Sequence, residues 1–207
     1  MRIEITGVSK SAGSALPMTT TAFSSGDVTL VPEETQLRPT VLGLIASGRM
    51  RPDTGIVTID GNADTAALRR RVALVDAPQV SEPALGVTLA TVVAEELMFA
   101  GRAAGPGAVS AQLHILGAAG WARTPIENVP AATRIRVLIE LALLRADVDA
   151  IVLTAPDRHG GDPLDWWRIS RDIADHGIAV LVIAGLASTA AIAADELLTR
   201  LGETESH

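Results

Sequence analysis

Residues 48–61 read Gly-Arg-Met-Arg-Pro-Asp-Thr-Gly-Ile-Val-Thr-Ile-Asp-Gly, and this stretch indicates how the chain around it folds. The first glycine is a natural C-terminal stop for a helix over 40–47, where apolar residues recur at helical spacing. Pro-Asp-Thr-Gly is a turn signature, and the apolar run 56–59 that follows favours a strand closed by an Asp-Gly turn. The stretch therefore predicts a helix, a turn and a strand in succession.

The residues before this helix favour β structure. Residues 2–6 alternate, 15–23 are rich in threonine, and 24–27 form a turn before the apolar run 28–31. We expect these segments to form a small N-terminal antiparallel layer.

The residues after the stretch alternate between strands and helices. Strands are expected at 72–75, 150–153 and 178–183, and helices at 134–144 and 164–174. Between 77 and 130 the chain is dominated by Ala, Leu and Gly, with a helical stretch over 89–100, which is typical of a helical insert. Continuous apolar strands separated by helices predict a parallel sheet covered on both faces.

Composition limits the function classes. The 207 residues suit one domain, and the absence of cysteine removes disulfides and thiolate metal sites. Charged or polar residues interrupt every apolar run before the roughly 20 residues that a membrane span needs. A net charge of -7 and an aromatic content of 2% argue against nucleic acid as a partner.

The stretch 48–61 resembles the segment that follows the phosphate-loop helix in the ATP-binding subunits of ABC transporters, where Gly, Pro, Gly and Asp-Gly recur at this spacing. The order of elements from about residue 2 to 201 is similar to that family as well. The resemblance implies an α/β fold of the P-loop NTPase type, with a central, mostly parallel sheet, the small antiparallel layer and a helical subdomain. One domain would span 1–207, with a core of about 1–76 and 134–207 and a helical subdomain of 77–133.

The phosphate loop of the family, G-x-x-x-x-G-K-[ST], falls here on residues 32–40, Pro-Glu-Glu-Thr-Gln-Leu-Arg-Pro-Thr. Two prolines remove backbone donors, a leucine replaces a permissive glycine, and two glutamates face any phosphate. One like-charge contact at about 4 Å costs about 4 kcal/mol at an effective dielectric of about 20. Only Arg38 and Thr40 keep a charge and a hydroxyl at suitable places. We therefore favour an ordinary strand-to-helix loop in which Pro39 starts the helix.

The resemblance places the magnesium-binding carboxylate and the general base at Thr154 and Ala155. Without those carboxylates, no side chain anchors the metal or orients the attacking water. Other functional positions of the family are also changed: the glutamine falls at Ala77, the switch histidine near Gly185, the signature loop on 129–133, and the adenine-stacking aromatic at Ser11 or Ala12.

Two features remain as interface candidates. Asp162-Pro163 resembles the turn along the family's dimer interface, although it comes one residue later than usual. On the following helix, Trp166 and Trp167 point about 100° apart. These indoles belong either to the core or to a partner surface, and the sequence leaves both open.

The resemblance and the lost motifs lead to one main hypothesis, a non-catalytic ABC-ATPase homologue that acts as a docking or regulatory subunit of a membrane transport system. Its partner would be a transmembrane permease or other membrane protein, a catalytic paralogue or a second copy. We expect a cytoplasmic location, reaching the inner face of the cell membrane through that partner, with neither ATP and magnesium nor another cofactor needed.

Two alternatives stay open. The chain could be an authentic but atypical ABC ATPase that binds phosphate through Arg38 and Thr40, with Asp157 or Asp162 as substitute carboxylates. It could instead be a metal-dependent hydrolase that uses the loop 157–162, Asp-Arg-His-Gly-Gly-Asp, although such Gly-rich polar loops are usually only solvated.

Overall fold

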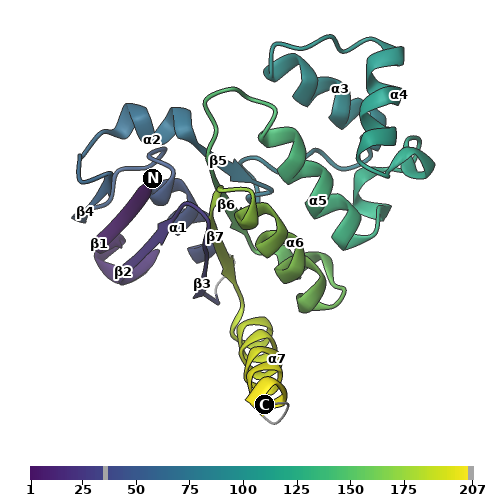
Figure 1. Ribbon diagram of the computed structural model, residues 1–207. Helices are drawn as coiled ribbons and strands as arrows, with labels where there is room; N and C mark the ends of the chain where they lie inside the picture. The colour runs from purple at the N-terminus through teal and green to yellow at the C-terminus, as the bar shows by residue number, and fades with distance from the viewer. Residues whose placement is uncertain (35–36, 205–207) are drawn as a thin grey trace.

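The computed structural model describes residues 1–34 and 37–204 and arranges them in layers around a parallel sheet (Figure 1). Within these residues the sheet has four strands in the order β3-β7-β6-β5, and each neighbouring pair is parallel. The strands are β3, Val28–Pro32; β5, Val72–Val75; β6, Ala150–Thr154; and β7, Ala179–Ala184. The expected parallel sheet is therefore confirmed.

A three-stranded antiparallel sheet in the order β2-β1-β4 lies beside it. Its strands are β1, Arg2–Lys10; β2, Leu16–Ser24; and β4, Thr54–Ile59, and the 3-10 helix η1, Ser11–Gly13, joins the first two. The small antiparallel layer is confirmed, but the placement of residues 28–31 within it is wrong. After β2 the Gly26 N–H donates to the Ile178 carbonyl, and the Val180 N–H donates to the Asp27 carbonyl, both at 3.1 Å. These bonds lead β3 into the parallel sheet and leave the third antiparallel position to β4.

Helix α1 (Arg38–Ala46) packs closely on the parallel sheet because Gly43 has no side chain. A Cβ atom at Gly43 would lie 2.7 Å from Thr154 Cγ2 and 2.8 Å from Leu74 Cδ1. The helix ends where the sequence predicts, since Gly48 adopts a left-handed φ of +68° just beyond it.

Helix α2 (Thr65–Arg71) precedes β5 and has no counterpart among the expected elements. Asp64 caps it by accepting the N–H groups of Ala66 and Ala67, each at 2.9 Å. Three arginines fill its last turn, where positive charge complements the helix dipole. The cap and these charges favour a helix that is too short to show a hydrophobic period.

Residues 77–133, called the insert below, are helical as expected. They contain α3, Leu89–Phe99; α4, Pro106–Ile115; the 3-10 helices η2, Ala119–Trp121, and η3, Ile126–Asn128; and the start of α5, Ala131–Ala142. Helix α3 packs on α4 and α5, and Figure 1 shows α3 and α4 to one side of the parallel sheet. The division of the chain into a core and a helical subdomain stays a prediction.

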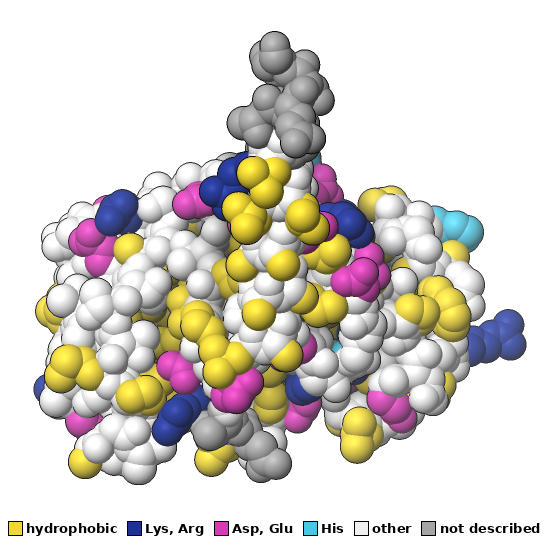
Figure 2. Space-filling model, turned by 90° about the horizontal axis from the view of Figure 1, so that it is seen from below, with side chains coloured by type: hydrophobic (Ala, Val, Ile, Leu, Met, Phe, Trp, Pro, Cys, Tyr) yellow, Lys and Arg dark blue, Asp and Glu magenta, His cyan; other side chains and the backbone are white. Residues whose placement is uncertain are grey.

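The chain continues into α6 (Pro163–Asp175) and α7 (Leu186–Thr204), which pack on each other. Ile192 of α7 is buried, whereas Leu197 and Leu198 are exposed. Figure 2 looks onto α7 and shows hydrophobic side chains along its outer surface, with acidic and basic residues on its flanks. Among the described residues, no helix has both the length and the apolar character that crossing a membrane requires.

The parallel sheet separates two hydrophobic clusters, because side chains along a strand alternate between its faces. Val75 and Leu153 face the cluster that contains α5, α6 and the insert helices. Their neighbours Leu74 and Val152 face α1 and the antiparallel sheet. Burial on both faces explains why these strands are continuous apolar runs in the sequence.

Candidate functional site

Four loops meet at one edge of the parallel sheet, where its strands end. Because the strands run in the same direction, the segments after β3, β5, β6 and β7 all emerge there. They border a cavity of about 590 Å³. The lining residues come from these loops and the start of α1: Glu33, Glu34, Leu37, Pro39, Pro78, Gln79, Ala155, Asp157, Arg158 and Gly185. The resemblance places a nucleotide at this edge, so the lining tests that expectation.

The start of α1 offers few groups to a phosphate. Arg38 is half-buried, and Thr40 is only 4% exposed. Among the described residues, neither the Thr40 hydroxyl nor the Arg38 Nε has a hydrogen-bond partner. Thr35 and Gln36 of the predicted loop lie outside the described residues.

The charge of the described part of this loop is acidic. Glu33 and Glu34 both line the cavity. The pKa of Glu33 is raised, because the effect of burial is larger than the opposing effect of the nearby Arg38 guanidinium. A carboxyl group that is already costly to ionise here would be still less favourable beside a phosphate.

Carboxylates of the protein itself occupy the N-terminus of α7. Glu34 Oε1 accepts the Leu186 N–H at 3.2 Å, and Asp157 Oδ2 accepts the Gly185 N–H at 2.9 Å. A helix N-terminus is electropositive and can bind anions through its free N–H groups. These two donors of α7 are already engaged, so they are not free to hold a phosphate.

The end of β6 carries no carboxylate. Thr154 is fully buried, and its hydroxyl donates to the Val75 carbonyl at 3.3 Å. Its methyl group lies against α1 at Gly43. Ala155 is left-handed, with φ of +47°, and its N–H donates to the Ile183 carbonyl at 2.8 Å. Neither side chain can ligate a metal ion strongly or activate a water molecule.

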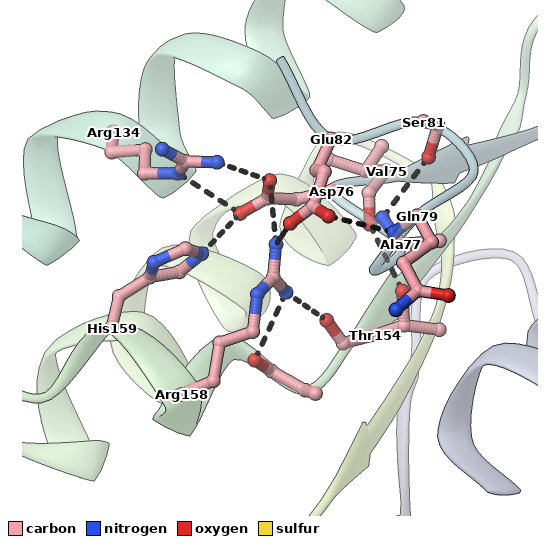
Figure 3. A network of polar contacts seen from close by, with 11 residues as sticks. Val75, Asp76, Ala77, Gln79, Ser81, Glu82, Arg134, Thr154, Arg158 and His159 are labelled. Atoms are coloured by element: carbon pink, nitrogen blue, oxygen red, sulfur yellow. Dashed lines mark hydrogen bonds and ion pairs between the residues drawn. The ribbon is translucent and has the colours of Figure 1, made fainter. Parts of the chain in front are cut away.

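A buried carboxylate does lie at this edge, but it belongs to Asp76, directly after β5 (Figure 3). Arg134 from α5 places Nη2 at 2.6 Å from Oδ1 and Nε at 3.1 Å from Oδ2. Arg158 Nη2 lies 3.0 Å from Oδ1, and His159 Nε2 lies 2.7 Å from Oδ2. Burial alone would raise the pKa of Asp76, but the hydrogen bonds from His159 and Arg134 and the positive charge of Arg158 outweigh it. The pKa of Asp76 is held well below its usual range.

The sequence pattern predicts no role for Asp76, and it places Arg134 on a helix whose predicted role is packing in the core. A signal was nevertheless present, since Asp76 directly follows a fully apolar strand and Arg134 lies in the first half of a helix whose other charged residues are Arg136 and Glu140. Ionic side chains in such positions need a partner of opposite charge.

The loop 157–162 does not bring its ionisable groups together. It begins in the 3-10 helix η4 (Pro156–His159), where Asp157 caps α7 and His159 contacts Asp76. Asp162 caps α6, since its Oδ1 accepts the Leu164 N–H at 2.9 Å. Within the described part of the chain, no three His, Asp or Glu side chains form a group that could hold a metal ion.

The interface candidates divide into two kinds. Asp162 is exposed and Pro163 is partly exposed at the start of α6, and their place at an interface stays a prediction. Trp166 and Trp167 are only 1% and 7% exposed. The Trp167 indole N–H also donates to Glu196 Oε1 at 3.1 Å. In this structure both indoles therefore pack in the core, which is one of the two alternatives that the sequence leaves open.

No family model and no curated protein matches the sequence. Solved structures do share its fold. CbiO1 from Clostridium perfringens, described as part of the ABC transporter complex cbiONQ, is 15% identical, with a TM-score of 0.60 and coverage of 88% of this chain and 77% of that one. The bacterial ABC transporter cassette MJ0796, determined as a dimer, is 18% identical, with a TM-score of 0.62 and coverage of 88% and 87%.

A third match is a nucleotide-free ATP-binding cassette from an ABC transporter. It is 18% identical, with a TM-score of 0.62, and the match covers 90% of this chain and 82% of that one. At such identities the matches establish the fold, and the function must be argued from the site.

Proposed function

We propose, from the fold that this chain shares with ABC transporter ATP-binding cassettes, that it is a non-catalytic docking or regulatory subunit of a membrane transport system. The observation that supports the proposal most strongly is the chemistry of the sheet edge where hydrolysis would occur. Thr154 and Ala155 stand where carboxylates are required, and Glu34 and Asp157 engage the end of α7. The residues present do not fit a magnesium–nucleotide complex.

The buried carboxylate of Asp76 does not replace the missing metal ligand. Arg134, Arg158 and His159 already engage both of its oxygens. A magnesium ion at this carboxylate would lie close to two guanidinium groups, and like charges at such distances repel strongly. Hydrolysis by positioning and charge neutralisation of a triphosphate therefore has no support here.

An atypical ATPase is the second candidate function. The cavity of about 590 Å³ at this edge favours it, together with the charge of Arg38 and the Thr40 hydroxyl, which has no hydrogen-bond partner among the residues that the structure describes. Glu33 and Glu34 in the same lining oppose it, because they repel a phosphate.

ATP binding and turnover separate the two candidates. We expect no turnover and no calorimetric binding with ATP and magnesium, for the natural protein, for Arg38→Ala and for the control Arg70→Ala at an exposed site on α2. An active ATP-binding cassette measured alongside establishes the sensitivity. Magnesium-dependent turnover that Arg38→Ala lowers and Arg70→Ala leaves unchanged would establish the ATPase instead.

A groove between the insert and the core supports the docking role. It has a volume of about 450 Å³, and its rim includes Val80 and Phe99, which are 49% and 75% exposed. Arg49 and Arg145 also line it, and neither has a carboxylate partner within 4.0 Å among the described residues. Burial and the positive charges of Arg145 and Arg69 lower the pKa of Arg49. Glu82, Glu95 and Glu96 line the groove as well, so its charges are mixed, and its exposed apolar rim suits an apolar segment of a membrane protein.

Purification from membranes of the source cells, followed by identification of the bound proteins, tests the docking role. A transmembrane protein should co-purify with the natural chain and with Ile115→Asp, a control at an exposed apolar residue outside the groove. Phe99→Asp and Val80→Asp, which place a charge on the exposed apolar rim, should each weaken the association. Equal recovery with all four proteins would refute the groove as the docking surface.

A further inference from the structure

The two ends of the insert meet at a buried ion pair. Asp76 is the residue before the insert, and Arg134 is the residue after it, so 58 positions of sequence separate them. Their side chains are 0% and 4% exposed and make two hydrogen bonds, at 2.6 and 3.1 Å. The chain thus leaves the core and returns to it through a pair of opposite charges in direct contact.

The segment after β6 joins this pair from the core side (Figure 3). His159 contacts Asp76 at 2.7 Å, and Arg158 contacts it at 3.0 Å. Arg158 also reaches into the insert, where its Nη2 lies 3.1 Å from Glu82 Oε2. Its Nη1 donates to the Thr154 carbonyl at 3.0 Å, which ties the same guanidinium to the end of β6. One side chain therefore connects a central strand of the core to the first loop of the insert.

The geometry of these contacts is directional. A guanidinium that meets both oxygens of a carboxylate through two N–H groups fixes angle as well as distance. The Asp76 backbone is left-handed, with φ of +54°, a conformation that aspartate tolerates better than most residues. Asp76 and Arg134 hold the two ends of the insert together, and a turn of the insert about these ends would pull Glu82, which lies inside it, away from Arg158.

We propose that Asp76, Arg134, Arg158 and His159 form an ionic clasp that holds the insert at one fixed angle to the core without any bound ligand. The clasp lies at the sheet edge, where a bound nucleotide would otherwise contribute charge and contacts. It goes beyond the proposed function, because it concerns the orientation of the insert and holds whether or not the protein binds ATP.

The absence of cysteine makes the orientation directly measurable. Spin labels at Arg70→Cys on α2 and Ser110→Cys on α4 report the distance between core and insert, and both positions are exposed. We expect pulsed electron double resonance, without nucleotide, to give a single narrow distance distribution. A broad or two-peaked distribution in the otherwise natural chain would overturn the clasp.

The decisive variant is Asp76→Asn with Arg134→Met, which removes both charges and keeps a side chain that tolerates the left-handed backbone. Its distance distribution should become about twice as wide or gain a second population, because the directional contact is lost. The matched control is Arg136→Met on the same helix, whose partners Asp172 and Glu140 lie outside the clasp. Circular dichroism and tryptophan fluorescence establish that each protein is folded.

A folded double variant with the narrow distribution of the natural chain would overturn the proposal. Should it fail to fold, Arg158→Gln decides, because this side chain is 22% exposed and its loss removes the link to Glu82. An unchanged distribution in Arg158→Gln would then count against the clasp, and a broadened one would support it. All measurements are made without ATP, so their outcome does not depend on whether the protein is an ATPase.

Discussion

Thr154 fills the position where the resemblance implies a magnesium-binding carboxylate, and its packing against α1 can be tested by a double substitution. Gly43→Ala introduces a methyl group 2.7 Å from Thr154 Cγ2 and 2.8 Å from Leu74 Cδ1. Thr154→Ser removes the first of these neighbours and keeps the hydroxyl that donates to the Val75 carbonyl. Combining the two substitutions therefore tests whether the Thr154 methyl group packs against α1 at Gly43.

Opposing terms set the size of the effect. Replacing glycine with alanine inside a helix stabilises it by about 1 kcal/mol, whereas forcing a methyl group into a packed core costs about 1–3 kcal/mol. Both contacts lie below 3.0 Å, and Thr154 is fully buried on a central strand, so we place Gly43→Ala at about 1–2 kcal/mol destabilising. Thr154→Ser should cost about 0.5–1.5 kcal/mol through its lost methyl group. The double variant should recover about 1 kcal/mol relative to the sum of the two.

Urea unfolding at pH 7, followed by tryptophan fluorescence, measures the three free energies of unfolding against the natural protein. Additivity within about 0.5 kcal/mol would refute the reasoning, because it would mean that the two methyl groups do not meet. Thr154 would then not fill the space below α1, and the argument that its side chain occupies the position of the metal-binding carboxylate would weaken.

Three further predictions concern the clasp and the antiparallel sheet. The pKa of folded Asp76 lies below its unfolded value, so its contribution to stability is present above that unfolded value and is lost as the pH falls towards the folded one. In urea unfolding from pH 7 to pH 2, the free energy of unfolding of Asp76→Asn should fall less steeply at acid pH than that of the natural protein, and an equally steep fall would contradict this. Arg134→Met should cost about 3–5 kcal/mol because it leaves a buried carboxylate short of its main partner, whereas Arg136→Met, at a pair that is more than one-third exposed, should cost less than about 1 kcal/mol; equal costs in urea unfolding would contradict the burial argument. Gly55→Ala should lower Tm more than Gly61→Ala, because both glycines have a left-handed φ but only a Cβ at Gly55 would collide with the Thr6 carbonyl of β1. Equal Tm values would contradict the close packing of β4 on β1 at Gly55.

The parallel sheet could be predicted because burial on both faces leaves a local trace in the sequence. The runs 72–75, 150–153 and 178–183 are apolar without alternation, and each became a strand within one residue of the expected bounds. The run 28–31 also became a strand, but its neighbour in the sheet could not be predicted, because β3 pairs with β7 about 150 positions later. Local patterns reveal a strand more readily than its place in a sheet.

The candidate site divides in the same way. The loss of carboxylates at Thr154 and Ala155 was readable because each position depends on one residue type. The cluster around Asp76 could not be predicted, since its members come from the segment after β5, from α5 and from the segment after β6, and each has an ordinary local interpretation. What the sequence does contain is the cost: an ionic residue beside an apolar strand or within an apolar helix requires a partner that only the tertiary fold supplies.

The electrostatics of the sheet edge explain how the fold can persist without a nucleotide. In an active cassette of the kind that the resemblance implies, a carboxylate at this edge is balanced by magnesium, and the electropositive helix ends by phosphate. Here Arg134 and Arg158 balance Asp76, while Glu34 and Asp157 engage the end of α7. The charge of Asp76 and the positive end of α7, which a ligand would neutralise, thus have partners within the chain. Because those partners are side chains of the same chain, these contacts do not depend on the nucleotide concentration. A subunit that only docks needs such permanent contacts, whereas a cassette driven by nucleotide binding and hydrolysis does not.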